Sequence, residues 1–180
     1  MLRFDVKKTI GIVLASLMLV AAGTAHSETD QGLISEATAT KAMFKKGDTG
    51  LKAWFDKAPG YVVFPGIGKA AIGIGGAHGT GVLFEKGQAV GKAKLNQLSV
   101  GAQLGGQEYA EVIFFETPAA LAKFKSGNFA FSGGLSAVAL KSGASANAKY
   151  TDGVAVFTAT KGGLMLEASV GGQKFGYDPF

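Results

Sequence analysis

Short runs of apolar and polar residues, separated by glycines, dominate the chain after Pro59. Between Pro59 and Gly81, aromatic and β-branched residues pass directly into glycines spaced two apart, a pattern typical of strands rather than helices. Glycine weakens an isolated strand. Its lack of a side chain must therefore serve the sheet in another way, by permitting tight curvature or the close approach of another layer. The pattern predicts a glycine-rich, curved sheet.

The predicted strands are short, and Gly, Asp or Lys-Gly turn signals lie between them. They cover residues 61–64, 70–77, 81–85, 89–95, 98–104, 109–115, 134–141, 144–150, 154–159, 164–170 and 173–177. Because the strands are short and adjacent in sequence, antiparallel pairing is the expected topology.

The segment of residues 28–58 has helical rather than strand periodicity. We expect two short helices here, with Gly47 ending the first and Asp48 or Thr49 capping the second. Pro59 follows as a stop signal, since proline does not continue a helix. The sequence therefore predicts a helical N-terminal segment ahead of the sheet.

One further helix interrupts the strands. Thr117 is a favourable N-cap, Pro118 fits the first turn, and the helix should end near Gly127. One helix between two β-rich halves makes the predicted fold class α+β, with a mostly antiparallel curved sheet or partly closed barrel. We assign residues 28–180 to a single domain, with a β-rich core over 59–180.

The first residues have the features of a secretory signal peptide. Arg3, Lys7 and Lys8 precede an apolar run, 10–22, that is shorter than the roughly 20 residues that span a bilayer. Small residues then allow cleavage after Ala25 or Ser27, while an uncleaved anchor is the weaker alternative. We therefore expect residues 1–27 to be removed and the mature protein to be periplasmic or secreted.

The residue types of the mature chain exclude several functions. The chain contains no cysteine, so we expect neither a lipoprotein anchor nor disulfides. Removal of the first 27 residues also removes Arg3, the only arginine. Lysine lacks the planar fork that recognises guanine or phosphate bidentately, so sequence-specific nucleic-acid binding is not expected.

A possible dinucleotide fingerprint, Gly66-x-Gly68-x-x-Ala71, follows a predicted strand. Such a motif must open a helix whose N-terminus faces the pyrophosphate. Ile72 and Ile74 alternate with glycine in the next positions and would make a very poor helix. We interpret these glycines as sheet geometry.

No other motif indicates catalysis. After cleavage at Ser27, His78 is the only histidine, and without cysteine it has no soft partner for a zinc site. Glu108 and Glu111 differ by an odd number, so in a strand they point to opposite faces. We expect no catalytic residues, no metal and no cofactor, and an uncharacterised hydrolase that depends on His78 is the least favoured hypothesis.

An outer-membrane barrel is a minority alternative, because the β-rich chain is exported and ends on Phe180. Stepping back by two from this residue gives Asp178, Gly176 and Lys174, whereas a lipid-facing strand should present apolar side chains there.

Several ordered motifs together are similar to a known family. The sequence resembles the SYLF lipid-binding domain family over roughly residues 38–175, a match carried by Val63-Phe64-Pro65-x-x-Gly68-Lys69, Gly73-x-Gly75-Gly76-x-x-Gly79-x-Gly81, Gly101-x-Gln103-x-Gly105-x-Gln107 and Lys161-Gly162-Gly163-Leu164-Met165. The resemblance implies a non-enzymatic domain. Eukaryotic members bind phosphoinositide membranes, partly through an amphipathic N-terminal segment, and some fungal members bind actin filaments.

An exported bacterial protein ordinarily meets neither actin nor phosphoinositides, so the resemblance implies an anionic phospholipid as partner and actin is not expected. Carried onto this chain, the candidate lipid-headgroup residues are Lys41, Lys45, Lys46, Lys52 and Lys69. The candidates for membrane insertion are Met43, Phe44 and Trp54. The alternative is a structural or protein-interaction module of the cell envelope, with a protein partner and no specific lipid.

Overall fold

The computed structural model describes residues 29–70, 76–98, 108–160 and 168–180, and one compact unit extends over Glu36–Phe180. Residues 29–47 are helical, and we call them the N-terminal helix. The other elements are α2 (Leu51–Lys57), β1 (Gly60–Ala70), β2 (Gly76–Glu85), β3 (Gln88–Leu98), β4 (Tyr109–Phe115), α3 (Pro118–Lys125), β5 (Phe129–Ala130), β6 (Ser136–Ala139), a 3-10 turn (Ala144–Ala146), β7 (Val154–Thr160), β8 (Ala168–Ser169) and β9 (Gln173–Pro179).

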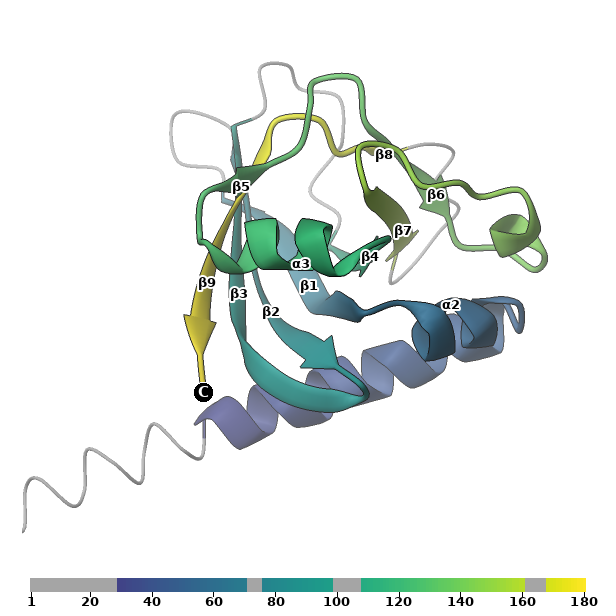
Figure 1. Cartoon of the computed structure of the whole chain (residues 1–180), viewed down its shortest axis with the longest axis horizontal. Helices are drawn as coiled ribbons and strands as arrows, with labels where there is room; N and C mark the ends of the chain where they lie inside the picture. Colours follow the sequence, from purple (N-terminus) through teal and green to yellow (C-terminus); the bar gives the residue numbers. More distant parts are fainter. Residues whose placement is uncertain (1–28, 71–75, 99–107, 161–167) are drawn as a thin grey trace, which may run out of the picture. The chain divides into compact units, whose positions relative to one another are not determined.

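The strands of the described residues form one nine-stranded sheet in the order β5-β9-β3-β2-β1-β4-β7-β6-β8. Neighbours pair antiparallel except β6 and β7, which pair in parallel. The long meander of β1, β2 and β3 forms the middle of the sheet, and β9 returns to pair with β3 (Figure 1). The predicted α+β class and the mostly antiparallel sheet are confirmed.

The face of the sheet that α3 covers, here called the inner face, carries the main apolar core. Side chains alternate between the two faces of a strand. Ile113 and Phe115 of β4 thus point to the inner face, where they join Leu121 and Phe124 of α3 in one buried cluster. Proline at the first turn and the Thr117 hydroxyl, which accepts a hydrogen bond from Ala120 N at 3.1 Å, start α3 as predicted.

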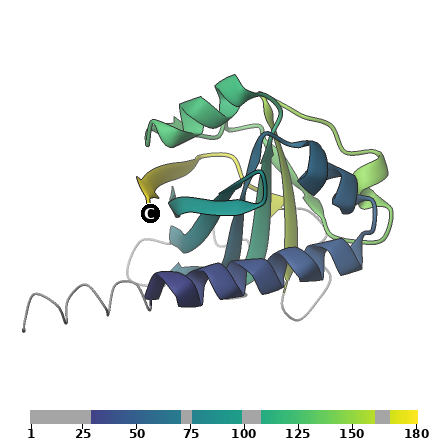
Figure 2. The ribbon, with the colours of Figure 1, turned by 60° about the horizontal axis from the view of Figure 1, so that its bottom comes forward.

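The opposite, outer face packs against α2 and the N-terminal helix. Phe114, between Ile113 and Phe115 in sequence, has its ring centroid 5.7 Å from Trp54 and 4.8 Å from Phe55 of α2. From residue 36 on, the N-terminal helix runs across the strands on this side (Figure 2). All residues of β4 are buried, because both faces of the sheet are covered.

The sheet is strongly curved, as the glycine pattern predicts. Phe64 of β1 and Phe175 of β9 lie with ring centroids 6.1 Å apart, although β2 and β3 stand between these strands in the sheet order. Adjacent strands are about 4.8 Å apart, so a flat sheet would hold the two strands roughly 14 Å apart. Curvature therefore brings β9 round to the inner-face side chains of β1.

Two helix predictions need correction. The first predicted helix is not short, because helical backbone extends over residues 29–47. Neither Asp48 nor Thr49 is the N-cap of α2, since that position is Gly50, which has no side chain to accept a bond from the first turn of the helix. Asp48 is buried instead, and its carboxylate accepts hydrogen bonds from Gly50 N at 2.9 Å and Ser145 N at 2.7 Å. This carboxylate joins the turn before α2 to the distant 3-10 turn.

The strand predicted at 144–150 is wrong. Gly143 has a φ of 77°, a left-handed conformation, and a 3-10 turn follows it. By contrast, the strand predicted at 109–115 is confirmed in both bounds, and β5 was missed because two residues carry no periodicity. Parts of the strands predicted at 70–77, 98–104 and 164–170, together with Ile72 and Ile74, lie outside the described residues.

A substitution at Gly81 tests whether the sheet requires a residue without a side chain at this position. A Cβ here would lie 2.6 Å from Val63 O and 2.7 Å from Phe64 Cδ1, both in the adjacent strand β1. We expect Gly81→Ala to lower the free energy of unfolding by about 2–3 kcal/mol, because strand separation must increase. The control is Gly68→Ala, since a Cβ at Gly68 meets nothing within 4 Å. Urea denaturation measures both, and equal losses would contradict the explanation by close approach.

Candidate functional site

A half-open pocket of about 580 Å³ is the candidate site. The N-terminal helix, α2, the start of β1, the β2–β3 turn and the start of α3 contribute its walls. It is lined by Lys41, Lys45, Phe55, Asp56, Ala58, Pro59, Tyr61, Glu85, Lys86, Gly87, Pro118 and Leu121. We call it the lysine pocket.

Two predicted headgroup residues, Lys41 and Lys45, lie one helical turn apart and both line the lysine pocket. Lys41 Nζ donates a hydrogen bond to Tyr61 Oη at 3.0 Å and lies 5.1 Å from the ring centroid of Phe84. Lys45 Nζ lies 5.1 Å from the ring centroid of Phe55. Aromatic faces attract a cation without neutralising it. Neither of these contacts places a carboxylate on the two ammonium groups.

Both carboxylates of the pocket are paired with lysines at its margin. Asp56 lies 2.9 Å from Lys52 Nζ, and Glu85 lies 2.7 Å from Lys125 Nζ. The hydrogen bond from Lys52 lowers the pKa of Asp56, with smaller contributions from the charges of Lys52, Lys45 and Lys41. The hydrogen bond to Glu85 raises the pKa of Lys125.

Together, the pocket and its margin hold an excess of positive charge. Three lysines line the pocket and two more pair with its carboxylates, so five lysines surround two acids. Exposed ion pairs contribute little free energy, but they do cancel the local negative charge. The lysines that remain face the pocket with three positive charges in excess, which suits an anionic ligand.

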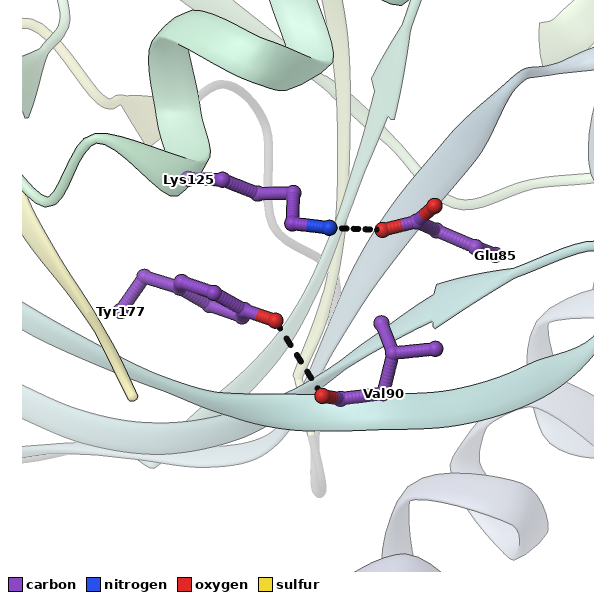
Figure 3. A network of polar contacts seen from close by, with 4 residues as sticks. All are labelled: Glu85, Val90, Lys125 and Tyr177. Carbon is purple, nitrogen blue, oxygen red and sulfur yellow. Dashed lines mark hydrogen bonds and ion pairs between the residues drawn. The ribbon is translucent and has the colours of Figure 1, made fainter. Parts of the chain in front are cut away.

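Contacts with the sheet hold the side of the lysine pocket that lies next to α3 (Figure 3). Lys125 and Glu85 point toward one another from α3 and the end of β2. Next to them, Tyr177 Oη of β9 donates to Val90 O of β3 at 3.1 Å, and Lys125 Nζ lies 5.7 Å from the Tyr177 ring centroid. These contacts fix the position of Lys125 beside the pocket.

The structure does not bring the other predicted headgroup residues into the pocket. Lys46 is exposed outside it, and Lys52 is at its margin through Asp56. The backbone of Lys69 pairs with Ala77 near the far end of β1. Eight strand residues, about 26 Å, separate it from Tyr61. Lys86 and Lys125 were missed, because the sequence marks one only as a turn residue and the other only as a helix end.

Of the three residues predicted to insert into a membrane, Met43 is 40% exposed. Phe44 is fully buried, and Trp54 is half-buried against the rings of Phe114, Tyr150 and Phe157. Phe44 is therefore part of the folded interior, and Trp54 is partly so. Of the three residues, Met43 is the exposed one, and membrane insertion stays a prediction.

The remaining candidate chemistry is sparse. His78 is exposed on β2, where its Nδ1 lies 2.8 Å from Asn96 Oδ1 of β3. Within the four described ranges, no three His, Cys, Asp or Glu side chains come together as a metal site. Over the same ranges, we find no helix with the length and apolar character needed to cross a membrane.

Comparison with known proteins identifies the family. Residues 96–178 match the family model described as "Las17-binding protein actin regulator". The chain is also similar to Beta cell expansion factor A of Aeromonas veronii, with 32% identity over 130 residues, or 71% of this chain and 49% of that protein. The chain thus spans about half the length of the relative that it matches. These matches agree with the motifs found in the sequence, and the chain belongs to the SYLF domain family.

Proposed function

We propose that this protein is an exported, non-enzymatic domain that binds anionic phospholipid membranes peripherally, with the lysine pocket as its headgroup site. The single observation that carries the proposal is the pocket's excess of positive charge: Lys41, Lys45 and Lys86 line it, while Asp56 and Glu85 are already paired. SYLF is not a known enzyme family, which agrees with a binding role. We further propose that the mature chain acts in the periplasm.

The physical mechanism is electrostatic attraction followed by local contact. Near an anionic membrane each lysine contributes about 1 kcal/mol, and salt weakens the attraction. A lipid phosphate in the pocket exchanges the ring contacts of Lys41 and Lys45 for charge-assisted hydrogen bonds. Exposed Met43 lies two helix positions from each of these lysines, on a different side of the N-terminal helix, so it is not part of the headgroup site. Binding of this kind is reversible and salt-sensitive.

Vesicle binding tests the proposal. The pocket variant carries Lys41→Gln, Lys45→Gln and Lys86→Gln, and the matched control carries Lys141→Gln, Lys149→Gln and Lys174→Gln, three exposed lysines outside the pocket. At about 1 kcal/mol for each lysine, the pocket variant should bind phosphatidylglycerol vesicles roughly 100-fold more weakly. The control should lose much less. Co-sedimentation at several lipid concentrations gives the partition coefficients.

Three results would contradict the proposal. These are equal binding to phosphatidylglycerol and phosphatidylcholine vesicles, equal losses in the pocket variant and its control, and binding that does not weaken with salt. If vesicle binding fails while a protein of the cell envelope co-purifies in stoichiometric amount, the alternative of a protein-interaction module is favoured.

A further inference from the structure

The inner face of the sheet contains a buried polar cluster that the lysine pocket does not use. It consists of Tyr109 and Glu111 of β4, Thr158 of β7 and Gln173 of β9. Glu111, Thr158 and Gln173 have no exposed surface, and Tyr109 is 6% exposed. A carboxyl group is almost never fully buried without a charged partner, so the cluster requires an explanation.

Gln173 and Glu111 connect two strands that are far apart in the sheet. Gln173 Nε2 donates a hydrogen bond to Glu111 Oε2 at 3.1 Å, and it also lies 3.4 Å from Tyr109 Oη. In the strand order, β3, β2 and β1 separate β9 from β4. The hydrogen bond therefore crosses the inside of the curved sheet rather than running along it. It is a direct polar link between β9 and β4.

The hydrogen bonding of the cluster is incomplete. Glu111 Oε1, Thr158 Oγ1 and Gln173 Oε1 are buried atoms for which the described residues provide no hydrogen-bond partner. Thr158 stands directly opposite Glu111 in the β4–β7 pairing. Unpartnered buried polar atoms are costly, and most so for an ionised group.

Protonation reduces this cost, because a neutral carboxyl group is far cheaper to bury than a carboxylate. Burial raises the pKa of Glu111 to about 8, and the hydrogen bond from Gln173 opposes this only in part. Within the described ranges, the titratable group that faces Glu111 is Tyr109. Burial, and then the charge of Glu111, raise the pKa of Tyr109 as well. Neither Gln173 nor Tyr109 carries a positive charge that could stabilise an ionised Glu111.

We propose that Glu111 and Gln173 form a proton-operated latch that holds β9 against β4 across the inside of the sheet. While Glu111 carries its proton, the neutral side chain stays buried and bonded to Gln173. When Glu111 ionises, the carboxylate must gain water, and β9 separates from the inner face to admit it. This device goes beyond the proposed lipid binding and does not depend on it.

Release of β9 would uncover apolar surface. Phe175 of β9 contacts Phe64, Phe129 and Phe131, with ring centroids 4.8 to 6.1 Å apart, and β5 is paired to β9. Among the described strands, β9 is bonded to β3 and to the two-residue β5. Opening β9 therefore breaks fewer strand pairings than opening β1 or β2, which each have two long neighbours.

The sign of the pH dependence follows from the two states. In the open state Glu111 is hydrated and its pKa returns towards 4.5, the ordinary value, while in the closed state it is about 8. Between these pH values the closed state holds one proton more than the open state. The opening constant should therefore rise about tenfold per pH unit from about pH 4.5 to 8, and then level off.

Hydrogen exchange of the mature protein between pH 5 and 9, corrected for intrinsic exchange rates, tests the latch. We expect amides of β9 to lose protection as the pH rises, and to exchange through an opening with a larger equilibrium constant than amides of β1 and β2. In Glu111→Gln, which is neutral at every pH, β9 protection should not depend on pH. Thr158→Val, which leaves the latch pair intact, should retain the dependence.

The inference is overturned if β9 and β2 exchange with the same opening constant at every pH, because the protein then opens only globally. It is also overturned if Glu111→Gln keeps the wild-type pH dependence. Gln173→Met gives a second check, since it removes the hydrogen bond without changing the charge. It should lower β9 protection already at pH 5, and full protection there would contradict the role of Gln173.

Discussion

Replacing Glu111 by glutamine is expected to stabilise the protein at pH 7 by up to about 3 kcal/mol. Burial raises the pKa of Glu111 from 4.5 to about 8 in the folded state. At pH 7 the unfolded chain carries this side chain ionised, so folding must take up a proton. Glutamine removes that cost, and its carbonyl can still accept the hydrogen bond from Gln173. Its amide group can donate to the unpartnered oxygen of Thr158 or Gln173.

The pH profile makes this first prediction specific. Stability from Glu111 is fully present below about pH 4.5, falls as the pH rises towards 8, and is constant above that value, because both states are then ionised. Urea denaturation should show this decline in the wild-type protein and a flatter profile in Glu111→Gln. The control is Glu116→Gln at an exposed position next to β4, which should change stability by less than about 0.5 kcal/mol. A profile unchanged by Glu111→Gln would refute the explanation.

Truncating Phe124 to alanine should cost about 3–5 kcal/mol. The side chain has no exposed surface, and together with Leu121 it packs α3 against the inner face. Its ring centroid lies 5.0 Å from Phe115, 5.7 Å from Phe129 and 5.8 Å from Phe175. Removal leaves a cavity among three rings from different strands, which cannot all collapse into it.

Thermal or urea unfolding measures the loss, and Lys123→Ala in the same helix is the matched control. Lys123 is exposed, and its ammonium group lies 5.8 Å from the Phe129 ring centroid, a weak contact. We expect a loss below about 1 kcal/mol for this variant. Similar losses in the two variants would mean that α3 is held by helix propensity rather than by its buried ring.

The lysine pocket and the buried polar cluster depend on different parts of the same sheet. The pocket is built around Tyr61 on the outer face and the ends of the neighbouring helices. The polar cluster lies on the inner face, between β4, β7 and β9. Within the described residues, Lys45 contacts Phe55 of α2, whereas Glu111 is bonded to Gln173 of β9. The effects of substitutions at these two residues on vesicle binding and on stability should therefore be separable.

Local chemistry was enough to predict several elements. A short run of mostly aromatic and β-branched residues identified β4 in both bounds, and Thr117 with Pro118 identified the start of α3. These signals depend on neighbours in sequence, so they can be interpreted without the fold. The strand expected at 144–150 failed because Ser145 is held by Asp48, a residue 97 positions away. No sequence pattern within that segment could predict a hydrogen bond to so distant a residue.

The candidate site was only partly visible in the sequence. Lys41 and Lys45 were identified, because the family resemblance placed lysines of that segment at the membrane. The sequence could not identify Lys86 and Lys125, because these residues come to the pocket and its margin from the β2–β3 turn and from α3. Trp54 was a candidate for membrane insertion, whereas its packing against rings of β4 and β7 leaves it half-buried.

By itself, the sequence determined the α+β class, the curvature of the glycine-rich sheet and the family, because residue type and spacing act over a few neighbouring positions. Only the tertiary structure decided which lysines surround a common pocket and which glutamate is buried. Both depend on strands and helices that are distant in the chain. For Glu111 the decisive neighbour is Gln173, brought within 3.1 Å by the curvature of the sheet.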